Sequence, residues 1–97
     1  MRQIERIRLM ESHLNQASEA VAALEAALDN YEAAQQPLRA LTQYYSSPQW
    51  RRDFIDDENG KIPKSLKRGV LSEDAVFNLI EENSLLRKRL NDLSRQE

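Results

Sequence analysis

The sequence contains no cysteine, and it has only two glycines, three prolines and one histidine among its 97 residues. Without cysteine, the chain has no disulfide framework, no thiolate nucleophile and no thiolate metal ligand. The two glycines, Gly60 and Gly69, do not match the spacing of loops that cradle phosphate groups. These absences argue against small disulfide-rich folds and against nucleotide-binding loops.

Catalytic groups are also scarce. His13 is the single histidine, it lies within a long helical pattern, and no Gly-x-Ser-x-Gly motif supplies a nucleophile. The neighbouring acids Glu81 and Glu82 would point in different directions from a helix, so they are poor candidates for shared acid–base chemistry. We therefore predict no catalytic residues, no cofactor site and no enzymatic activity.

Long apolar runs are missing as well. No uninterrupted apolar stretch approaches the roughly 20 residues that span a bilayer, and the first ten residues carry three arginines and a glutamate rather than an apolar signal core. The formal net charge is -2. We expect a soluble cytoplasmic protein without membrane contact.

What the chain does contain is typical of helices. Charged residues make up 31% of the sequence, and alanine, leucine, glutamate, arginine and glutamine dominate. We predict an all-α single domain over residues 1–97, in which the two long helices pack as an antiparallel helical hairpin or small bundle. The expected segments are a long helix at 2–35, short helices at 37–46 and 48–57, a turn and basic segment at 58–71, and a C-terminal helix at 73–94.

The first helix carries a heptad pattern. Apolar residues recur at alternating spacings of three and four, which is typical of coiled coils, at Ile7, Met10, Leu14, Ala17, Val21, Leu24, Leu28 and Tyr31. The predicted C-terminal helix, about 33 Å long, cannot cover a stripe of about 50 Å. We predict an antiparallel two-fold homodimer that shares the stripe from Ile7 to Val21, with a different helical protein as the alternative partner.

Pro37 is expected to kink or break this helix at Gln36. Further on, Ser47 should cap a short helix whose first residue is Pro48. In that helix, Trp50 and Phe54 are one turn apart and should pack inward. We expect Trp50 to be largely buried as a structural anchor and residues 51–53 to be exposed to solvent. The alternative is that the exposed aromatic stacks on nucleic-acid bases beside the arginines.

The acidic stretch Asp56–Gly60 resembles a calcium loop only superficially. If Gly60 were its sixth residue, the first and last ligand positions would be Ile55 and Leu66, whose side chains cannot bind calcium. We predict no metal site and interpret the stretch as a polar turn in which Asn59 and Gly60 adopt positive φ angles.

Residues 61–72 contain cations without acids, namely Lys61, Lys64, Lys67 and Arg68. The acids on either side of this basic segment favour local charge compensation across a turn. Nucleic-acid binding is the alternative, although a domain that binds phosphates usually has a strongly basic balance.

The start of the last helix is well marked. Gly69 should break the chain, Ser72 should cap the helix, and Asp74 in its first turn complements the helix dipole. An apolar seam then follows, and Asn83 falls inside it. Asn83 either fixes the register of a partner helix or hydrogen-bonds a backbone group near residues 44–62.

The run PKSLKRGVLSEDAVFNL, together with YYSSPQW and the IERI start, resembles a small bacterial all-helical family, domain of unknown function 4298. This resemblance implies a bacterial helical protein that is similar over nearly the whole chain, and it implies no activity.

We therefore expect a scaffold, an adaptor or a self-assembling module that acts through protein–protein interaction, as a homodimer or with a helical partner. Its expected interaction surface consists of Ile7, Met10, Leu14, Val21 and the basic segment. The alternative function is a regulator that contacts nucleic acid through the basic segment with Arg51 and Arg52.

Overall fold

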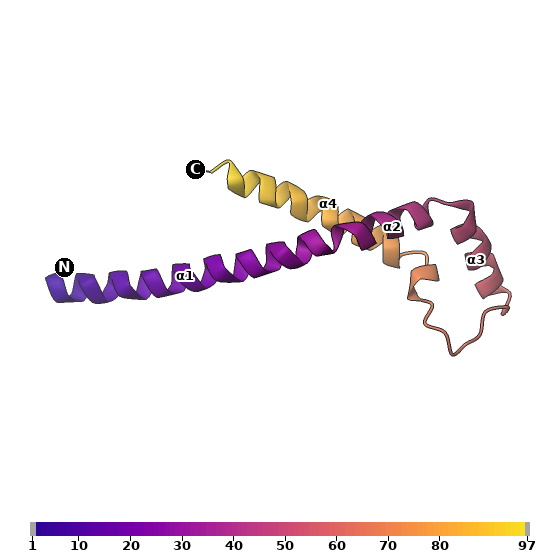
Figure 1. The fold of residues 1–97 in the computed structure, drawn as a ribbon, viewed down its shortest axis with the longest axis horizontal. Helices are drawn as coiled ribbons and strands as arrows, with labels where there is room; N and C mark the ends of the chain where they lie inside the picture. Colours follow the sequence, from indigo (N-terminus) through magenta and orange to yellow (C-terminus); the bar gives the residue numbers. More distant parts are fainter. Residues whose placement is uncertain (1, 97) are drawn as a thin grey trace. The chain divides into compact units, whose positions relative to one another are not determined.

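A computed structural model describes residues 2–96, most of which are helical, and there is no strand among them. Figure 1 shows the order of the elements: α1 (Gln3–Ala33), α2 (Gln35–Tyr45), α3 (Pro48–Glu58), a short 3-10 helix η1 (Gly69–Leu71) and α4 (Ala75–Ser94). The predicted all-α class with a long N-terminal helix is confirmed. The chain divides into two compact units, one ending at Gln36 and one beginning at Pro37.

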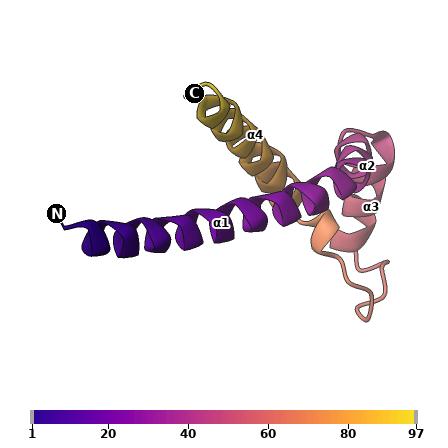
Figure 2. The same cartoon turned by 60° about the vertical axis from the view of Figure 1, so that its left-hand side comes forward.

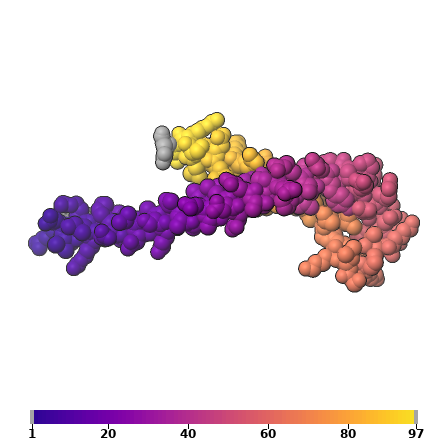
Figure 3. All heavy atoms as spheres, viewed as in Figure 1, coloured from indigo at the N-terminus to yellow at the C-terminus, as the bar shows by residue number. Residues whose placement is uncertain are grey.

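The first unit consists mainly of α1. Its 31 residues make a helix of about 46 Å at 1.5 Å per residue. Every residue from Arg2 to Asn30 is exposed, and Figure 3 shows the heavy atoms of this helix as spheres in indigo and purple. No side chain caps its first turn, although Glu5 there complements the positive end of the helix dipole.

The break between α1 and α2 lies at Ala34, so the predicted position at Gln36 was wrong. Proline clashes with the carbonyl group four residues earlier, and four residues before Pro37 is Ala33, the last residue of α1. Pro37 itself sits in the first turn of α2, where backbone N–H groups have no partner within the helix. The second helix therefore starts two residues before Pro37 instead of after it.

The corner between α2 and α3 follows the prediction. Ser47 is extended, its Oγ accepts the backbone N–H of Trp50 at 3.3 Å, and Pro48 is the first residue of α3. The same hydroxyl donates to the carbonyl oxygen of Tyr44 at 2.6 Å. Ser47 thus bonds to the end of one helix and the start of the next, and its cap role is confirmed.

The end of α3 is a Schellman motif. Gly60 has φ of 73° and its N–H donates to the carbonyl oxygen of Asp57, while the N–H of Lys61 donates to that of Asp56. Asn59 has φ of -84°, so only Gly60, and not Asn59 as predicted, adopts a positive φ. The acids at 56–58 belong to the last turn of α3 and not to the turn after it.

The second unit is built around η1. The segment after α3 runs out and returns to η1 just before α4 (Figure 2), and η1 contacts both α3 and α4. In the described part of the chain, the only buried apolar residues are Leu71 of η1, 6% exposed, and Val76 of α4, 4% exposed. Half-buried apolar and aromatic side chains add to them, namely Leu38, Leu41, Tyr44, Tyr45, Trp50, Phe54, Ile62, Val70 and Ile80.

The last helix begins at Ala75, two residues later than predicted. Ser72 nevertheless has extended backbone angles, its Oγ accepts the N–H of Ala75 at 3.2 Å, and its hydroxyl donates to the carbonyl oxygen of Gly69 at 2.9 Å. The side chain of Asp74 makes no cap hydrogen bond, and its carbonyl oxygen accepts the N–H of Asn78. Residues 73 and 74 form a turn that the Ser72 hydroxyl closes.

Gly69 does not have a positive φ, and a Cβ placed on it would meet no atom within 4 Å. The backbone at this position therefore does not require glycine, although the sequence predicted that Gly69 would break the chain there.

Asn83, which the sequence placed in the apolar seam of the last helix, is half-buried on α4.

Candidate interaction surface

The largest candidate surface is the α1 seam, which we define as the eight heptad residues Ile7, Met10, Leu14, Ala17, Val21, Leu24, Leu28 and Tyr31. Seven of these are exposed and Tyr31 is half-buried. The exposed fractions of three of them are 50% for Ile7, 58% for Leu14 and 66% for Val21. Because such residues are normally buried, an exposed apolar stripe of this length is typical of an interaction site.

The local sequence explains why this seam is a continuous helix. Strong helix formers fill most of the intervening positions, and no proline or glycine interrupts residues 3–33. The charges on α1 are unevenly placed. Three arginines and one glutamate lie within the first eight residues, whereas residues 9–33 carry five acids and neither lysine nor arginine. The helix therefore has a basic start, over residues 2–8, and a long acidic remainder.

A second exposed apolar stripe lies on α4. Its exposed members are spaced by three, four or seven residues, namely Leu79, Leu86, Leu90 and Leu93. Val76 continues this stripe into the buried core, and Asn83 lies between Leu79 and Leu86. The stripe on α4 is shorter than the α1 seam, because α4 has 20 residues.

The basic segment contains one paired cation and three exposed ones. Arg68 forms an ion pair with Asp57 at the end of α3, whereas Lys61, Lys64 and Lys67 are exposed. Local compensation across the turn is therefore present for Arg68.

Trp50 lies in a cluster of three aromatic residues. Its ring stacks on Phe54 with the centroids 5.1 Å apart, and Tyr45 approaches edge-on at 4.9 Å. Its Nε1 donates to the carbonyl oxygen of Val70 at 2.9 Å. The indole is half-buried instead of largely buried as predicted, and the cluster joins α3 to η1.

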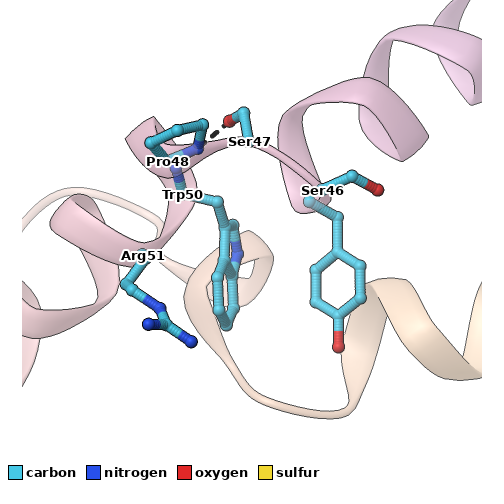
Figure 4. A pocket seen from close by; sticks show the side chains of 6 residues that line it. Ser46, Ser47, Pro48, Trp50 and Arg51 are labelled. Atoms are coloured by element: carbon cyan, nitrogen blue, oxygen red, sulfur yellow. Dashed lines mark hydrogen bonds between the residues drawn. The ribbon is translucent and has the colours of Figure 1, made fainter.

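One side of this cluster borders an open hollow of about 510 Å³, lined by Tyr45, Ser46, Ser47, Pro48, Trp50 and Arg51. Figure 4 shows the indole of Trp50 and the guanidinium of Arg51 pointing to the same side of α3. Arg51 is exposed. The hollow offers one aromatic wall and one cation, without a buried polar group directed into it.

Tyr44 and Asp53 make a contact that the sequence pattern did not predict. The Tyr44 hydroxyl donates to Oδ2 of Asp53 at 2.5 Å. Asp53 is half-buried, whereas the sequence predicted that it would be exposed to solvent. Burial of the phenol, the hydrogen bond to Asp53 and the charge of that carboxylate together raise the pKa of Tyr44 to about 12. Tyr44 therefore keeps its proton at neutral pH and acts as a hydrogen-bond donor.

Two further findings concern residues 2–96. No three side chains among His, Asp and Glu gather there in a way that could hold a metal ion. None of the described helices has the length and apolar character needed to cross a membrane.

Comparison with protein-family models finds a match that covers residues 7–92 and is described as Domain of unknown function (DUF4298). The chain belongs to this family. The DUF4298 match begins at Ile7, the first residue of the α1 seam, and includes the whole basic segment and most of α4. Comparisons with curated proteins and with solved structures found no match.

Proposed function

We propose that this DUF4298 chain is a non-enzymatic helical module that acts through protein–protein interaction, with the α1 seam as its binding surface. The observation that carries this proposal is the exposure of heptad residues over the length of α1. Side chains at these positions lose contact with water when a second helix packs against them. A scaffold or adaptor role in the cytoplasm is the function that we infer for such a surface.

Site-specific photo-crosslinking in living cells tests the proposal. A photoreactive amino acid at Leu14 lies in the seam, and the same amino acid at Ser12 lies on the opposite face of α1. Both positions are exposed in the isolated chain. We expect crosslinked products from position 14 and none from position 12. Equal crosslinking at the two positions, or none at either, would contradict the proposal.

Contact with nucleic acid is the second candidate, and the exposed lysines Lys61, Lys64 and Lys67 favour it. Two observations weaken it, because Arg68 is paired with Asp57 and the Trp50 ring is stacked within the chain. Fluorescence anisotropy with duplex DNA and duplex RNA at two salt concentrations tests this candidate. Phosphate-driven binding weakens steeply as salt rises, and the absence of binding at low salt would exclude it.

A further inference from the structure

We propose that the hollow beside Trp50 and a neighbouring hollow on α3 form one groove that docks a short segment of another protein, in which an acidic residue lies between two apolar ones. This groove lies in the second unit of the chain, so the inference goes beyond the α1 seam and does not depend on it. Three observations carry it: the continuity of the two hollows, the order of side chains along α3, and two arginines without an internal partner in the described part of the chain.

The two hollows are adjacent because they share residues. The second one, of about 310 Å³, is lined by Pro48, Arg51, Arg52, Ile55 and Asp56. Pro48 and Arg51 also line the hollow of about 510 Å³, and we call the two together the α3 groove. Small-molecule sites enclose most of their ligand, whereas this groove is open and extends along α3. Its shape therefore favours a peptide that lies across the surface.

The order of side chains along α3 indicates the order of residues in the peptide. Pro48, Arg51, Arg52 and Ile55 have the spacing of one helix face, and all four are exposed. Apolar residues lie at the two ends of this face and cations in the middle. Pro48 and Ile55 are about 10 Å apart along the helix, a length that three or four residues of an extended segment span at about 3.3 Å each. A complementary segment therefore has an apolar residue, an acid and a second apolar residue in close succession.

Charge selects an acid for the middle position. The side chains of Arg51 and Arg52 make no ion pair and no hydrogen bond with the described residues, whereas the adjacent carboxylate of Asp53 already accepts the hydroxyl of Tyr44. A guanidinium group binds a carboxylate through two parallel hydrogen bonds. The two arginines can therefore bind a carboxylate of a partner without the loss of a contact within the chain.

Hydrogen bonding in the larger hollow indicates the same ligand. The other polar side chains that line it already donate their hydrogens within the chain, and these are Tyr45, Ser46, Ser47 and Trp50. The guanidinium of Arg51, which points to the same side of α3 as the indole of Trp50 (Figure 4), is thus the side-chain donor left for a ligand. A ligand in this hollow satisfies Arg51 by supplying an acceptor, and an acidic residue supplies a charged one.

Nucleic acid fits the α3 groove less well than a peptide does. A nucleic-acid strand is bound by cations that follow its backbone, whereas Asp56 lies beside Ile55 at one end of the groove and would repel a phosphate there. The proposed segment has an apolar residue at that end. The groove is therefore matched to a segment with a single acidic centre and not to a continuous phosphate backbone.

Selection from a library of random heptapeptides displayed on phage tests the proposal, with the immobilised full-length chain as the target. Heptapeptides are too short to form stable helices by themselves, which limits binding of amphipathic helices to the α1 seam. We expect the enriched peptides to carry an aspartate or glutamate between two apolar residues. The absence of enrichment, or enrichment of peptides without an acid, would overturn the inference.

Titration of the most enriched peptide then measures the role of the arginines. Trp50 is the only tryptophan of the chain, so its fluorescence reports binding in the groove. A second peptide, with the acid replaced by its amide, should bind about three- to fivefold more weakly, as expected for the loss of an exposed ion pair. The double variant Arg51→Gln, Arg52→Gln should bind the two peptides equally. The charge-matched control Arg39→Gln, Arg89→Gln, at exposed positions of α2 and α4, should still distinguish them.

Equal affinities of the unmodified chain for the acidic peptide and its amide would overturn the inference, as would a double variant that distinguishes them as well as the control does. Displacement of the peptide by single-stranded oligothymidylate at low salt, with tighter binding of the oligonucleotide, would assign the groove to nucleic acid instead. Crosslinking from position 14 tests the α1 seam separately, so failure of one surface does not imply failure of the other.

Discussion

The indole Nε1 of Trp50 donates a hydrogen bond to the carbonyl oxygen of Val70, 2.9 Å away and 20 residues later in the chain. This bond joins α3 to η1, and the next residue after Val70 is Leu71, one of the two buried apolar residues in the described part of the chain. The loop that returns from α3 is thus held by a side-chain hydrogen bond beside an apolar contact. Trp50 is therefore the residue whose replacement should most directly loosen the second unit.

Truncation of Trp50 should destabilise this unit. For Trp50→Ala we expect a loss of about 3 kcal/mol or less, below the upper values for aromatic truncation because the indole is half-buried. Trp50→Phe keeps a ring for Phe54 but leaves the Val70 carbonyl without this donor, which should cost about 1 kcal/mol. Urea unfolding followed by circular dichroism measures both values. Gln49→Ala, at an exposed position of the same helix, serves as the control and should change little.

The two glycines should respond in opposite ways to alanine. Gly60 has φ of 73°, where a residue with a Cβ is disfavoured by about 1 to 2 kcal/mol, so Gly60→Ala should destabilise the protein. Gly69 has no positive φ, and a methyl group added there would meet no atom within 4 Å, so Gly69→Ala should be neutral or stabilising by up to about 1 kcal/mol. Thermal unfolding of the two variants in parallel measures the difference. A larger loss for Gly69→Ala than for Gly60→Ala would contradict the described turn.

Local features of the fold could be predicted from the sequence because their causes lie within a few residues. Helix α1 forms because its residues favour helical backbone angles. The hydroxyl groups of Ser47 and Ser72 bond to backbone groups only three residues away. The break before α2 was misplaced because the clash caused by Pro37 acts four residues upstream, on Ala33. Even this error has a local explanation.

Contacts between distant segments could not be predicted in the same way. The sequence predicted that flanking acids compensate the basic segment, but it did not single out the pair of Arg68 and Asp57, 11 residues apart. It gave no sign of the hydrogen bond between Tyr44 and Asp53, 9 residues apart. Each pair depends on the direction in which the chain turns after a helix, which composition and periodicity do not determine. The α1 seam could be predicted because its heptad spacing is visible in the sequence, whereas that spacing alone does not say what covers it.

Loss of the Ser72 hydroxyl should weaken the start of α4. The hydroxyl accepts the N–H of Ala75 and donates to the carbonyl of Gly69, and loss of such a cap typically costs about 1 kcal/mol. Ser72→Ala should therefore lower the free energy of unfolding by about that amount. Ser84→Ala, at an exposed position within α4, is the matched control and should be neutral or slightly stabilising, because alanine has the higher helix propensity. Equal stability of Ser72→Ala and the unmodified chain would show that α4 starts without this cap.

The Tyr44–Asp53 hydrogen bond should make stability depend on pH in the alkaline range. The pKa of Tyr44 is about 12 in the folded chain against an ordinary value of 10.0, so the folded state retains the phenolic proton more strongly than the unfolded state does. The stabilisation from this difference is fully present below pH 10 and is lost as the pH rises from 10 through 12. Tyr44→Phe has no phenolic proton to lose, so its stability should not show this part of the decrease at alkaline pH.

Absorbance titration of tyrosinate measures the pKa of Tyr44 directly. The unmodified chain has three tyrosines, and the component near pH 12 should disappear in Tyr44→Phe. Asp53→Asn removes the carboxylate but leaves the burial of the phenol, so it should lower the pKa of Tyr44 from about 12 toward 10.0 without restoring it fully. If Tyr44 already titrates at its ordinary value in the unmodified chain, the hydrogen bond between α2 and α3 is not formed in solution. The half-burial of Asp53 would then have no compensating partner, and the packing of these two helices would differ from that described.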